Sequence, residues 1–424
     1  MSATTLTFLR SIEVAQATPF LAYSIQQLRR RGVQSQMYYT DGECTPADFP
    51  GRATKIPPEV TATEICTILA DHDRPALVSL SIPDENAVRD AFVKEQLEHR
   101  GGRVVCCNAL MASTFANKWA TKSVLTAHGI SVPDAVPVDG DLLNGRGPNY
   151  VEYTSVLRTQ VRKLGYPVLV KPLWDCLGNG IVYLANERDL NTYLTAPGPG
   201  NAIIERCITG TLCSVEVLSC DGRVYIQPIA LKGPANGPPS FAFTQVRHTR
   251  ALSTDPADQD LATRLTQLCN SGGIEGAIEF EFVYDGSDYI CIEVNPRVSG
   301  STGISIAASG VNTYYQLARM ALRPWIPPTP ADLPTCIALQ FPVHHERPLP
   351  GLPPEVKLHR LNTFTVPGRG NFRSALISIP GTSPTHIRRW VDASTHTRAI
   401  DESTATQLEA LLVVGGRPIE SSRV

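Results

Sequence analysis

The stretch from Gly276 to Gly303 constrains this 424-residue chain most strongly, because it gathers acidic side chains on one face of two predicted strands. Apolar and polar residues alternate along 278–282 and again along 290–295, which is typical of strands buried on one side. The apolar set is Ile278, Phe280, Phe282, Ile290, Ile292 and Val294, and the polar set is Glu279, Glu281, Glu293 and Asn295. Cys291 lies in an apolar run and is expected to be buried. Carboxylate and amide oxygens are the ligands that hard cations such as Mg²⁺ prefer. The pattern therefore predicts a hairpin whose polar face suits a metal ion.

The length of the turn decides which residues face each other across this hairpin. A two-residue turn at Asp285-Gly286 would pair Glu281 with Ile290 and place Glu293 on the other face. A five-residue connection over 285–289 would pair Glu281 directly with Glu293. Two facing carboxylates repel each other unless a cation lies between them. The residues alone leave both alternatives open: a short hairpin with solvated acids, or a longer hairpin that holds Mg²⁺.

The spacing of these residues is similar to the metal-binding hairpin of the ATP-grasp superfamily. The resemblance rests on Glu281, on the motif Glu293-Val-Asn295-Pro-Arg297 that follows it, and on the small-residue loop VSGSTG at 298–303. It is strongest to carboxylate–amine ligases and biotin-carboxylase-like members, and it covers about residues 113–323. It implies that the chain uses ATP with Mg²⁺ or Mn²⁺. It also implies that Glu281, Glu293 and Asn295 bind the metal, and that Arg297 is a catalytic residue that holds the substrate carboxylate.

Composition narrows the class of protein further. The chain is 42% hydrophobic and 18% charged, which is ordinary for a globular protein of two or three domains. The net charge is −2 and the basic run Arg29–Arg31 is short, so we expect no nucleic-acid partner. The N-terminus lacks the apolar core of a signal peptide and no long apolar run occurs, so we expect a cytoplasmic protein without a membrane partner. The 11 cysteines include no C-x-x-C pair, and we expect reduced thiols.

Residues 1–112 alternate predicted strands and helices. Strands are expected at 6–9, 36–39, 76–80 and 103–107, and helices at 15–31, 63–70 and 85–99. This alternation predicts a small parallel α/β domain. No G-x-G-x-x-G motif follows the first strand, so a dinucleotide site is not predicted. The resemblance identifies this part as the domain that precedes the ATP-grasp core, and a homodimer formed through it would fit the family.

Residues 113–205 are expected to form the first part of the core, including a flap subdomain. Lys118 begins a predicted helix, where its charge opposes the helix dipole, and Lys171 ends a predicted strand before a loop with glycines. Glycines allow backbone N–H groups to approach phosphates, and a lysine offsets their charge. A solvated lysine and an ordinary hairpin remain the alternatives. The resemblance implies that the loop covers ATP, with phosphate contacts from Lys118, Lys171, Gly178 and Gly180, and that Lys171 is also a catalytic residue. Residues 134–150 are predicted to be a loop.

Residues 206–325 are expected to form the second part of the core. The resemblance implies an adenine site where the two parts meet. The segment 202–210 resembles the family's hinge, which implies that Glu205 and Ile208 contact the adenine. Leu212 stands where many relatives carry a carboxylate for the ribose. The candidates for substrate binding are Glu216, Arg247, Ser299, Gly300 and Ser301. A solvated strand residue remains the alternative for Glu216, and a solvated basic face for Arg247.

Residues 326–424 are expected to form a β-rich subdomain with strands at 336–341, 357–365 and 374–379 and a helix at 404–412. The predicted fold is thus α/β in the N-terminal domain and α+β beyond it. Taken together, the resemblance implies an ADP-forming ligase that joins a small-molecule carboxylate to an amine through an acyl phosphate, on amino-acid or small-peptide substrates. Two alternatives remain. One is a carboxylating enzyme that uses bicarbonate, and the other is a catalytically silent nucleotide-binding regulatory protein.

Overall fold

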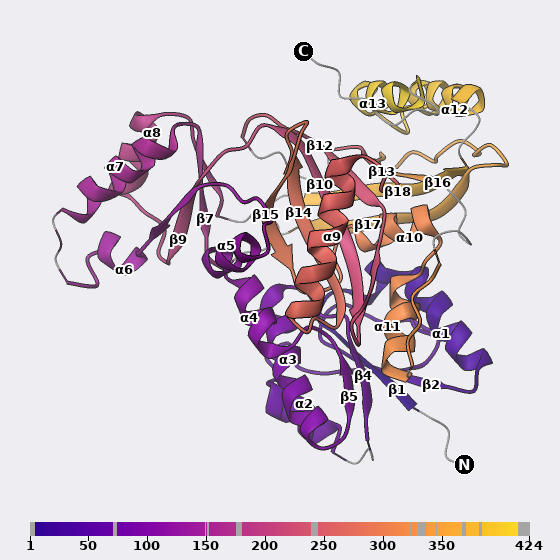
Figure 1. The fold of residues 1–424 in the computed structure, drawn as a ribbon. Helices are drawn as coiled ribbons and strands as arrows, with labels where there is room; N and C mark the ends of the chain where they lie inside the picture. Colours follow the sequence, from indigo (N-terminus) through magenta and orange to yellow (C-terminus); the bar gives the residue numbers. More distant parts are fainter. Residues whose placement is uncertain are drawn as a thin grey trace.

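Three β-sheets organise the chain (Figure 1). The structure is a computed structural model, and it describes residues 5–70, 74–148, 150, 152–174, 180–238, 245–322, 324–329, 336–344, 346–366, 370–380 and 384–413. The N-terminal sheet is parallel, whereas every strand pair in the other two sheets is antiparallel. This arrangement confirms the predicted combination of an α/β domain with an α+β core. Within the described residues no helix has the length and apolar character needed to span a membrane.

The N-terminal sheet has β1 at its centre, in the order β3-β2-β1-β4-β5. Its strands are β1 (Thr5–Arg10), β2 (Gln34–Tyr39), β3 (Arg52–Lys55), β4 (Ala76–Ser79) and β5 (Arg103–Val105). The connections contain η1 (Val14–Ala17), α1 (Phe20–Arg30), α2 (Ala62–Ile68) and α3 (Asp84–His99). The chain leaves β1 toward β2 on one side and returns to β4 on the other. The crevice at the carboxyl ends of β1 and β4 is therefore a topological switch point, the usual ligand site of such sheets.

Two details of this domain differ from the predictions. The predicted helix at 15–31 begins only at Phe20. Pro19 explains the difference, because a proline disfavours the helical conformation of the residue before it. Strand β3 has no counterpart among the predicted strands, since four residues of mixed polarity give no clear period.

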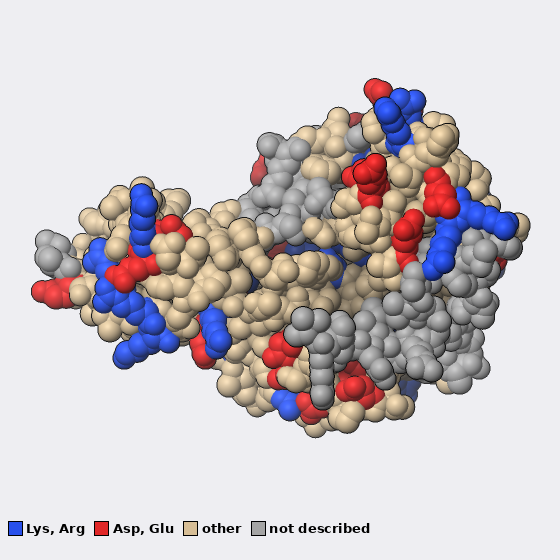
Figure 2. Space-filling model, turned by 90° about the horizontal axis from the view of Figure 1, so that it is seen from above, with Lys and Arg blue, Asp and Glu red and all other residues tan. Residues whose placement is uncertain are grey.

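A four-stranded sheet forms a separate subdomain, in the order β6-β9-β7-β8. Its elements are β6 (Ala135–Val138), α6 (Gly140–Leu143), α7 (Tyr153–Leu164), β7 (Val168–Pro172), β8 (Val182–Leu184), α8 (Glu187–Thr195) and β9 (Ala202–Arg206). The prediction of a loop at 134–150 is wrong, because β6 and α6 lie there. Asp139 caps α6, and its side chain accepts hydrogen bonds from the amides of Asp141 and Leu142. Figure 2 shows this subdomain projecting from the body, with a hollow between them that contains Lys and Arg atoms.

The third sheet runs through the body of the molecule, in the order β15-β14-β10-β12-β13-β16-β18-β17, with β11 paired to β10. Its first strands are β10 (Gly210–Cys220), β11 (Arg223–Ile226), β12 (Ile229–Ala235), β13 (Arg247–Arg250), β14 (Gly276–Tyr284) and β15 (Tyr289–Asn295). The predicted C-terminal strands are β16 (Cys336–Pro342), β17 (Lys357–Val366) and β18 (Gly370–Pro380), and they extend this same sheet. They are followed by α12 (Pro384–His396) and by α13 (Glu402–Val413), which matches the predicted C-terminal helix.

The remaining helices cover this sheet and connect it to the N-terminal domain (Figure 1). They are α4 (Ala109–Ala116), α5 (Lys118–Ala127), α9 (Pro256–Ser271), α10 (Thr302–Ser309) and α11 (Thr313–Leu322). The apolar face of β14 packs against α4 and α9 in a fully buried cluster that includes Phe115, Leu265, Ile278, Phe280 and Phe282. Burial of one such side chain contributes about 1.5–3 kcal/mol, so this cluster fixes which face of β14 points outward.

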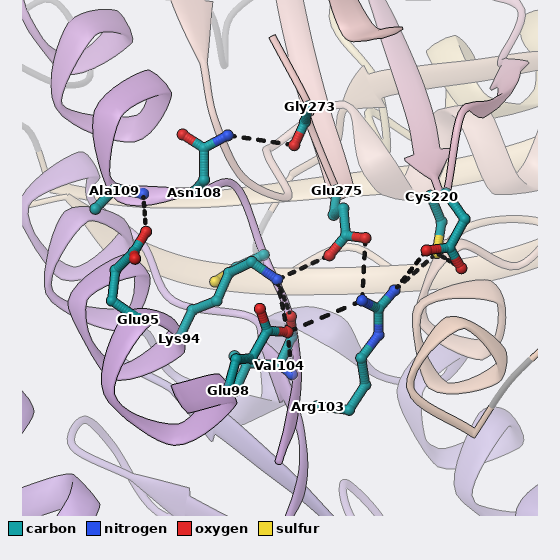
Figure 3. A network of polar contacts seen from close by, with 12 residues as sticks. Lys94, Glu95, Glu98, Arg103, Val104, Asn108, Ala109, Cys220, Gly273 and Glu275 are labelled. Carbon is teal, nitrogen blue, oxygen red and sulfur yellow. Dashed lines mark hydrogen bonds and ion pairs between the residues drawn. The ribbon is translucent and has the colours of Figure 1, made fainter. Parts of the chain in front are cut away.

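A polar network joins the N-terminal domain to the body (Figure 3). Lys94 donates to Glu98 (2.8 Å), to the Val104 carbonyl (2.7 Å) and to Glu275 (2.8 Å). Arg103 pairs with the other oxygen of Glu275 at 3.0 Å. Glu275 lies directly before β14, so this network fixes the N-terminal domain relative to the acidic hairpin.

Asp258 connects helix α9 to the far end of the hairpin. Its carboxylate accepts hydrogen bonds from both terminal nitrogens of Arg250 (2.6 and 2.8 Å), from the Tyr289 hydroxyl (2.6 Å) and from Ser253. Burial alone would raise the pKa of Asp258, but these hydrogen bonds hold it well below its ordinary value. The folded protein therefore favours the ionised form.

We expect Asp258→Asn to lower the free energy of unfolding by about 3 kcal/mol at pH 7, because it breaks a buried pair. A folded-state pKa below the unfolded value stabilises the protein above about pH 4, and this contribution is lost as the pH falls further. Urea denaturation of wild type and variant from pH 7 to pH 3 should show their difference shrinking. Asp260→Asn is the matched control, since that side chain is 50% exposed on the same helix. A difference that stays constant with pH would contradict this account.

Candidate active site

The acidic hairpin pairs Glu281 with Glu293 and Glu279 with Asn295. This is the pairing that the longer-turn alternative predicts, but the route to it differs. The connection has four residues, 285–288, because Tyr284 pairs with Tyr289. A bulge then shifts the register between the 282–291 and 281–293 pairs. Such a bulge places two residues opposite one and restores the facing carboxylates.

The bulge also changes which residues of β15 are buried. Tyr289 and Cys291 lie in the apolar core together with Val294, whereas Ile290 and Ile292 are only partly buried. The placement of Ile290 and Ile292 on the buried apolar face is therefore wrong for the end of β15 near the turn, whereas Cys291 is buried, as expected for a small apolar residue. A strict period of two holds only on one side of a bulge, which explains the difference.

Lys232 lies between two acidic residues of β14. Its ammonium group is 3.2 Å from Glu279 and 2.9 Å from Glu281, and its side chain is 6% exposed. Burial would raise the pKa of Glu279, but Lys232 and the hydroxyls of Ser301, Ser214 and Ser299 lower it to about 2. Burial and the neighbouring carboxylates raise the pKa of Glu281. The site thus holds closely spaced carboxylates whose repulsion a cation must offset.

The second facing carboxylate and the motif that follows it bring in two further segments. Glu293 pairs with Lys118 at 2.9 Å, so the lysine at the start of α5 points at the hairpin. Asn295 donates to Glu279 at 3.2 Å and accepts from Arg297 at 3.0 Å. The sequence therefore identified Lys118, Glu293, Asn295 and Arg297 as candidates, and the structure brings them together.

Arg297 forms an ion pair that the sequence does not predict. Its Nε atom lies 2.5 Å from a carboxylate oxygen of Asp84, the first residue of α3. Burial raises the pKa of Asp84, and the Arg297 guanidinium opposes this shift. The contact links the hairpin directly to the carboxyl edge of the N-terminal sheet, where Asp84 follows β4.

Glu205 is held by two lysines of the flap subdomain and the adjoining helix. Lys171 on β7 lies 2.5 Å from one oxygen of Glu205, and Lys122 on α5 lies 2.8 Å from the other. Burial would raise the pKa of Glu205, but the two ammonium groups lower it. The Glu205 side chain is 1% exposed and engaged by both lysines, so its carboxylate is directed at Lys171 and Lys122 and not at open space.

The other predicted nucleotide contacts are placed as follows. Ile208 is partly buried in the connection between β9 and β10. Gly180 has a φ of +79°, a left-handed conformation that glycine adopts readily, and an added Cβ would lie 2.9 Å from Pro172. Gly178 lies outside the described residues. Leu212 lies on β10 opposite Val283, so no carboxylate occupies the expected ribose position.

The candidate substrate residues fall into two groups. Arg247, at 6% exposure, interacts electrostatically with Glu281 and Glu279, so it belongs to the acidic site. Ser299 and Ser301 hydrogen-bond the Glu279 carboxylate, and Gly300 is exposed between them. These residues therefore lie beside the acidic side chains of the hairpin.

Glu216 belongs to the other group. It lies opposite Glu279 on the neighbouring strand β10, but its oxygens accept hydrogen bonds from Thr302 and Thr313. These threonines are the first residues of α10 and α11. Burial raises the pKa of Glu216 to about 7. The carboxyl group is thus fully engaged in holding two helix N-termini against the sheet.

The donor set fits a divalent cation of the Mg²⁺ type. Glu281 and Glu293 face each other, and Asn295 lies one position beyond on the same face. Here each carboxylate is paired with a lysine, Glu281 with Lys232 and Glu293 with Lys118. A second candidate group, Cys220, Asp221 and Glu275, also has ligand atoms close together. The Arg103 guanidinium already contacts all three, so that group forms an ion-pair network.

Comparison with known proteins agrees with this arrangement. Residues 115–301 match the model of the ATP-grasp domain. This stretch contains Lys118, Lys171, Glu205 and the whole acidic hairpin through Ser301, whereas Asp84 lies outside it.

Two relatives of the ATP-grasp domain show how far the similarity extends. The chain is 24% identical over 299 residues to a carbamoyl-phosphate synthase of Methanobrevibacter smithii, covering 69% of this chain and 76% of that protein. It is 27% identical over 248 residues to a biotin carboxylase of Pseudomonas aeruginosa, covering 55% of this chain and 51% of that protein. The chain thus spans about half of the biotin carboxylase.

The similarity to solved structures covers nearly the whole chain. An L-amino acid ligase from Bacillus licheniformis has a TM-score of 0.63 at 17% identity and covers 96% of this chain and 97% of its own. The biotin carboxylase domain of a Hydrogenobacter thermophilus 2-oxoglutarate carboxylase has a TM-score of 0.65 at 15% identity, covering 90% and 89%. That domain was solved as a dimer with MgADP, ADP and bicarbonate. At these identities the likeness establishes a shared fold.

Sequence reasoning missed Lys122, Lys232 and Asp84 in the candidate site. Lys232 carries a signal that was available, because it directly follows an apolar run as Lys171 does. Lys122 follows Lys118 at helical spacing of four, which places both on one face of α5. Asp84 has no comparable signal, since its role depends on packing between the N-terminal sheet and the hairpin.

Proposed function

We propose that this protein is an ADP-forming ligase that joins a carboxylate to an amine through an acyl phosphate, with amino acids or small peptides as substrates. The observation that carries the proposal is the pairing of Glu281 with Glu293, together with the lysines directed at both. Facing carboxylates with lysines on either side suit a metal-bound triphosphate, whose charges are complementary to both sets. The fold it shares with an L-amino acid ligase supports the choice of substrates.

The cofactors of this proposal are ATP and Mg²⁺, and Mn²⁺ is the alternative metal. The related carboxylase domain with MgADP supports them. Glu281, Glu293 and Asn295 would hold the metal, which would neutralise phosphate charge as the phosphoryl group transfers. On ATP binding, Lys118 would exchange its ion pair with Glu293 for a contact with the phosphates. Lys171 would exchange its ion pair with Glu205 in the same way. Each ion pair seen here would thus be exchanged for a pair with the ligand, so that charge in the buried site stays balanced.

In the first proposed step, a carboxylate oxygen attacks the γ-phosphorus and the bond to the β-phosphate oxygen breaks, releasing ADP. Arg297 holds the attacking carboxylate with its planar guanidinium. Asp84 fixes the orientation of that guanidinium by accepting from Nε. The amine then attacks the acyl carbon and phosphate leaves with the bonding electrons, while the amine loses a proton to solvent. The flap containing Gly178 and Gly180 would exclude water from the acyl phosphate.

The domain division at 1–112, 113–205, 206–325 and 326–424 belongs to the same proposal. The first part would supply substrate contacts, and the second and third would enclose ATP. The fourth would extend the central sheet, as β16–β18 do in the structure. A homodimer through residues 1–112 is also proposed, with the dimeric carboxylase domain as its support.

One alternative function has a specific observation in its favour. The similar carboxylase domain holds bicarbonate, and bicarbonate is a carboxylate-like acid that could react in the same site. The alternative predicts ADP release with bicarbonate, whereas the ligase predicts release only with an amino-acid pair.

The test is ADP and phosphate release from Mg-ATP across single and paired amino acids, with bicarbonate as a separate reaction. Release that requires a particular pair, with a product mass equal to the condensed acids, would support the ligase. Release with bicarbonate alone would support the carboxylating alternative. If no reaction releases ADP or phosphate although the protein still binds ATP, the result would favour a regulatory nucleotide-binding protein and contradict the ligase.

A further inference from the structure

Arg10 occupies the ligand-binding edge of the N-terminal sheet. It is the last residue of β1 and is 3% exposed. Its terminal nitrogens donate to the carbonyls of Leu80 (3.4 Å), after β4, and Glu13 (3.2 Å), in the loop after β1. It therefore lies across the switch point between β1 and β4. Its Nε atom is buried without a hydrogen-bond partner.

Arg360 approaches the same region from the opposite end of the chain. It lies on β17, directly after a bulge, because Leu358 pairs with Ile377 while Arg360 pairs with Leu376. A bulge redirects the side chains that follow it. Arg360 donates to the carbonyl of Gln16 at 2.5 Å, in the short helix η1 that follows β1. A Cβ atom added to Gly303 would lie 3.5 Å from the guanidinium, so Arg360 also contacts the end of the VSGSTG loop.

Arg360 interacts electrostatically with both Arg10 and Arg247. Burial lowers the pKa of Arg360, Tyr314 opposes this shift, and the charges of Arg10 and Arg247 lower the pKa further. Arg247 in turn interacts with Glu281 and Glu279. A line of positive charge thus leads from the acidic hairpin, past the VSGSTG loop, to the edge of the N-terminal sheet. Its near end lies beside the proposed reaction centre.

Arg10 and Arg360 form no ion pair in the described structure. No carboxylate among the described residues lies within 4.0 Å of either guanidinium, and their hydrogen bonds go to carbonyl oxygens. Glu13 and Tyr314 act on Arg10 electrostatically, and Tyr314 also acts on Arg360. By contrast, Lys171, Lys232 and Lys118 each pair directly with a glutamate. Burial of a guanidinium without an ion-pair partner is unfavourable, so the buried Arg10 and the partly buried Arg360 favour binding of an anion from outside.

We propose that Arg10 and Arg360 bind a non-reacting oxyanion of a substrate, either a carboxylate or a phosphate group. The substrate would reach from the metal-binding hairpin to the N-terminal sheet, with its reacting group near Arg297 and its second anionic group on the two arginines. Guanidinium groups suit this task because they bind oxyanions in a bidentate manner and stay charged when buried. The inference rests on the proposed ligase function and narrows its substrates to acids or amines that carry a second negative charge.

The first experiment measures anion binding without turnover. Succinate and inorganic phosphate are titrated separately by calorimetry into wild type, Arg10→Gln, Arg360→Gln and the control Arg52→Gln, an exposed residue of edge strand β3. We expect binding of at least one anion to weaken about tenfold or more in both site variants and to remain unchanged in the control. If neither anion binds wild type, or if both bind all four proteins equally, the proposal is overturned. Arg360→Gln tests the same site independently, so the experiment still decides the question if Arg10→Gln does not fold.

The second experiment uses the reaction and distinguishes the source of the anion. A productive amino acid is compared with the amine that lacks its carboxylate, and a productive diacid or phosphorylated acid is compared with the matching uncharged acid. We expect wild type to prefer the anionic member of one comparison by about 100-fold in kcat/KM, and Arg360→Gln to lose most of that preference. If Arg360 has only a structural role, Arg360→Gln would lower kcat/KM equally for both members of each comparison. That result would overturn the proposal. Anion binding without any ADP release would leave the anion site standing and reject the ligase.

Discussion

Glu281→Gln and Glu293→Gln should each reduce ATP turnover by about 100-fold or more while the protein remains folded. Glutamine keeps the shape of the side chain but removes the negative charge that a divalent metal requires. Both side chains are partly exposed, at 21% and 27%, so the polar replacement is tolerated in the fold. The measurement is steady-state ADP release with Mg-ATP, together with a thermal melt of each variant.

Glu409→Gln serves as the control for these two variants, since Glu409 is exposed on α13. It should retain full turnover. Turnover that survives in both hairpin variants would show that the metal assignment is wrong. Loss of turnover together with loss of the folded state would show a structural role for the carboxylates and would contradict the separate metal role.

Lys232→Met should destabilise the metal-free protein by about 3–5 kcal/mol, because it removes the cation between Glu279 and Glu281 and leaves their charges buried. The loss should be smaller when Mg²⁺ and ADP are present, since the bound metal then offsets the same carboxylates. Urea denaturation with and without Mg-ADP measures both values. Turnover should fall as well, because the ammonium lies beside the proposed reaction centre.

Lys163→Met is the control for this comparison, because Lys163 is exposed in the last turn of α7. It should change stability by less than about 0.5 kcal/mol in either condition. Equal destabilisation of Lys232→Met with and without Mg-ADP would mean that no metal approaches Glu279 and Glu281. That result would contradict the proposal that a bound metal offsets the charges of these carboxylates in place of Lys232.

These predictions depend on charge balance in a buried site. Five carboxylates and several lysines and arginines lie near the hairpin, and most of them are paired with one another. The cations of these pairs come from several elements, with Lys118 and Lys122 on α5, Lys171 on β7 and Lys232 on β12. A bound metal nucleotide carries both signs of charge, so it can replace several of these pairs at once without leaving an isolated ion.

The sequence by itself determined the local parts of this site. The alternation around Glu281 and Glu293 predicted two strands with acids on one face, and residue spacing identified their pairing as one of two alternatives. Strand-ending Lys171 and helix-starting Lys118 were found because each stands at the boundary of a strongly patterned element. These features depend on the period and ends of single elements, which neighbouring residues encode.

Only the tertiary structure decided how the hairpin reaches its pairing and what surrounds it. The bulge in β15 leaves Ile290 and Ile292 only partly buried, and no period in that strand reveals it. Asp84, Arg10 and Arg360 come from segments up to 350 residues apart, the separation of Arg10 and Arg360 (360 − 10). Each looks like an ordinary solvated charge in its own segment. Their roles arise because folding brings the carboxyl edge of the N-terminal sheet against the hairpin and β17, where burial makes an unpaired charge matter.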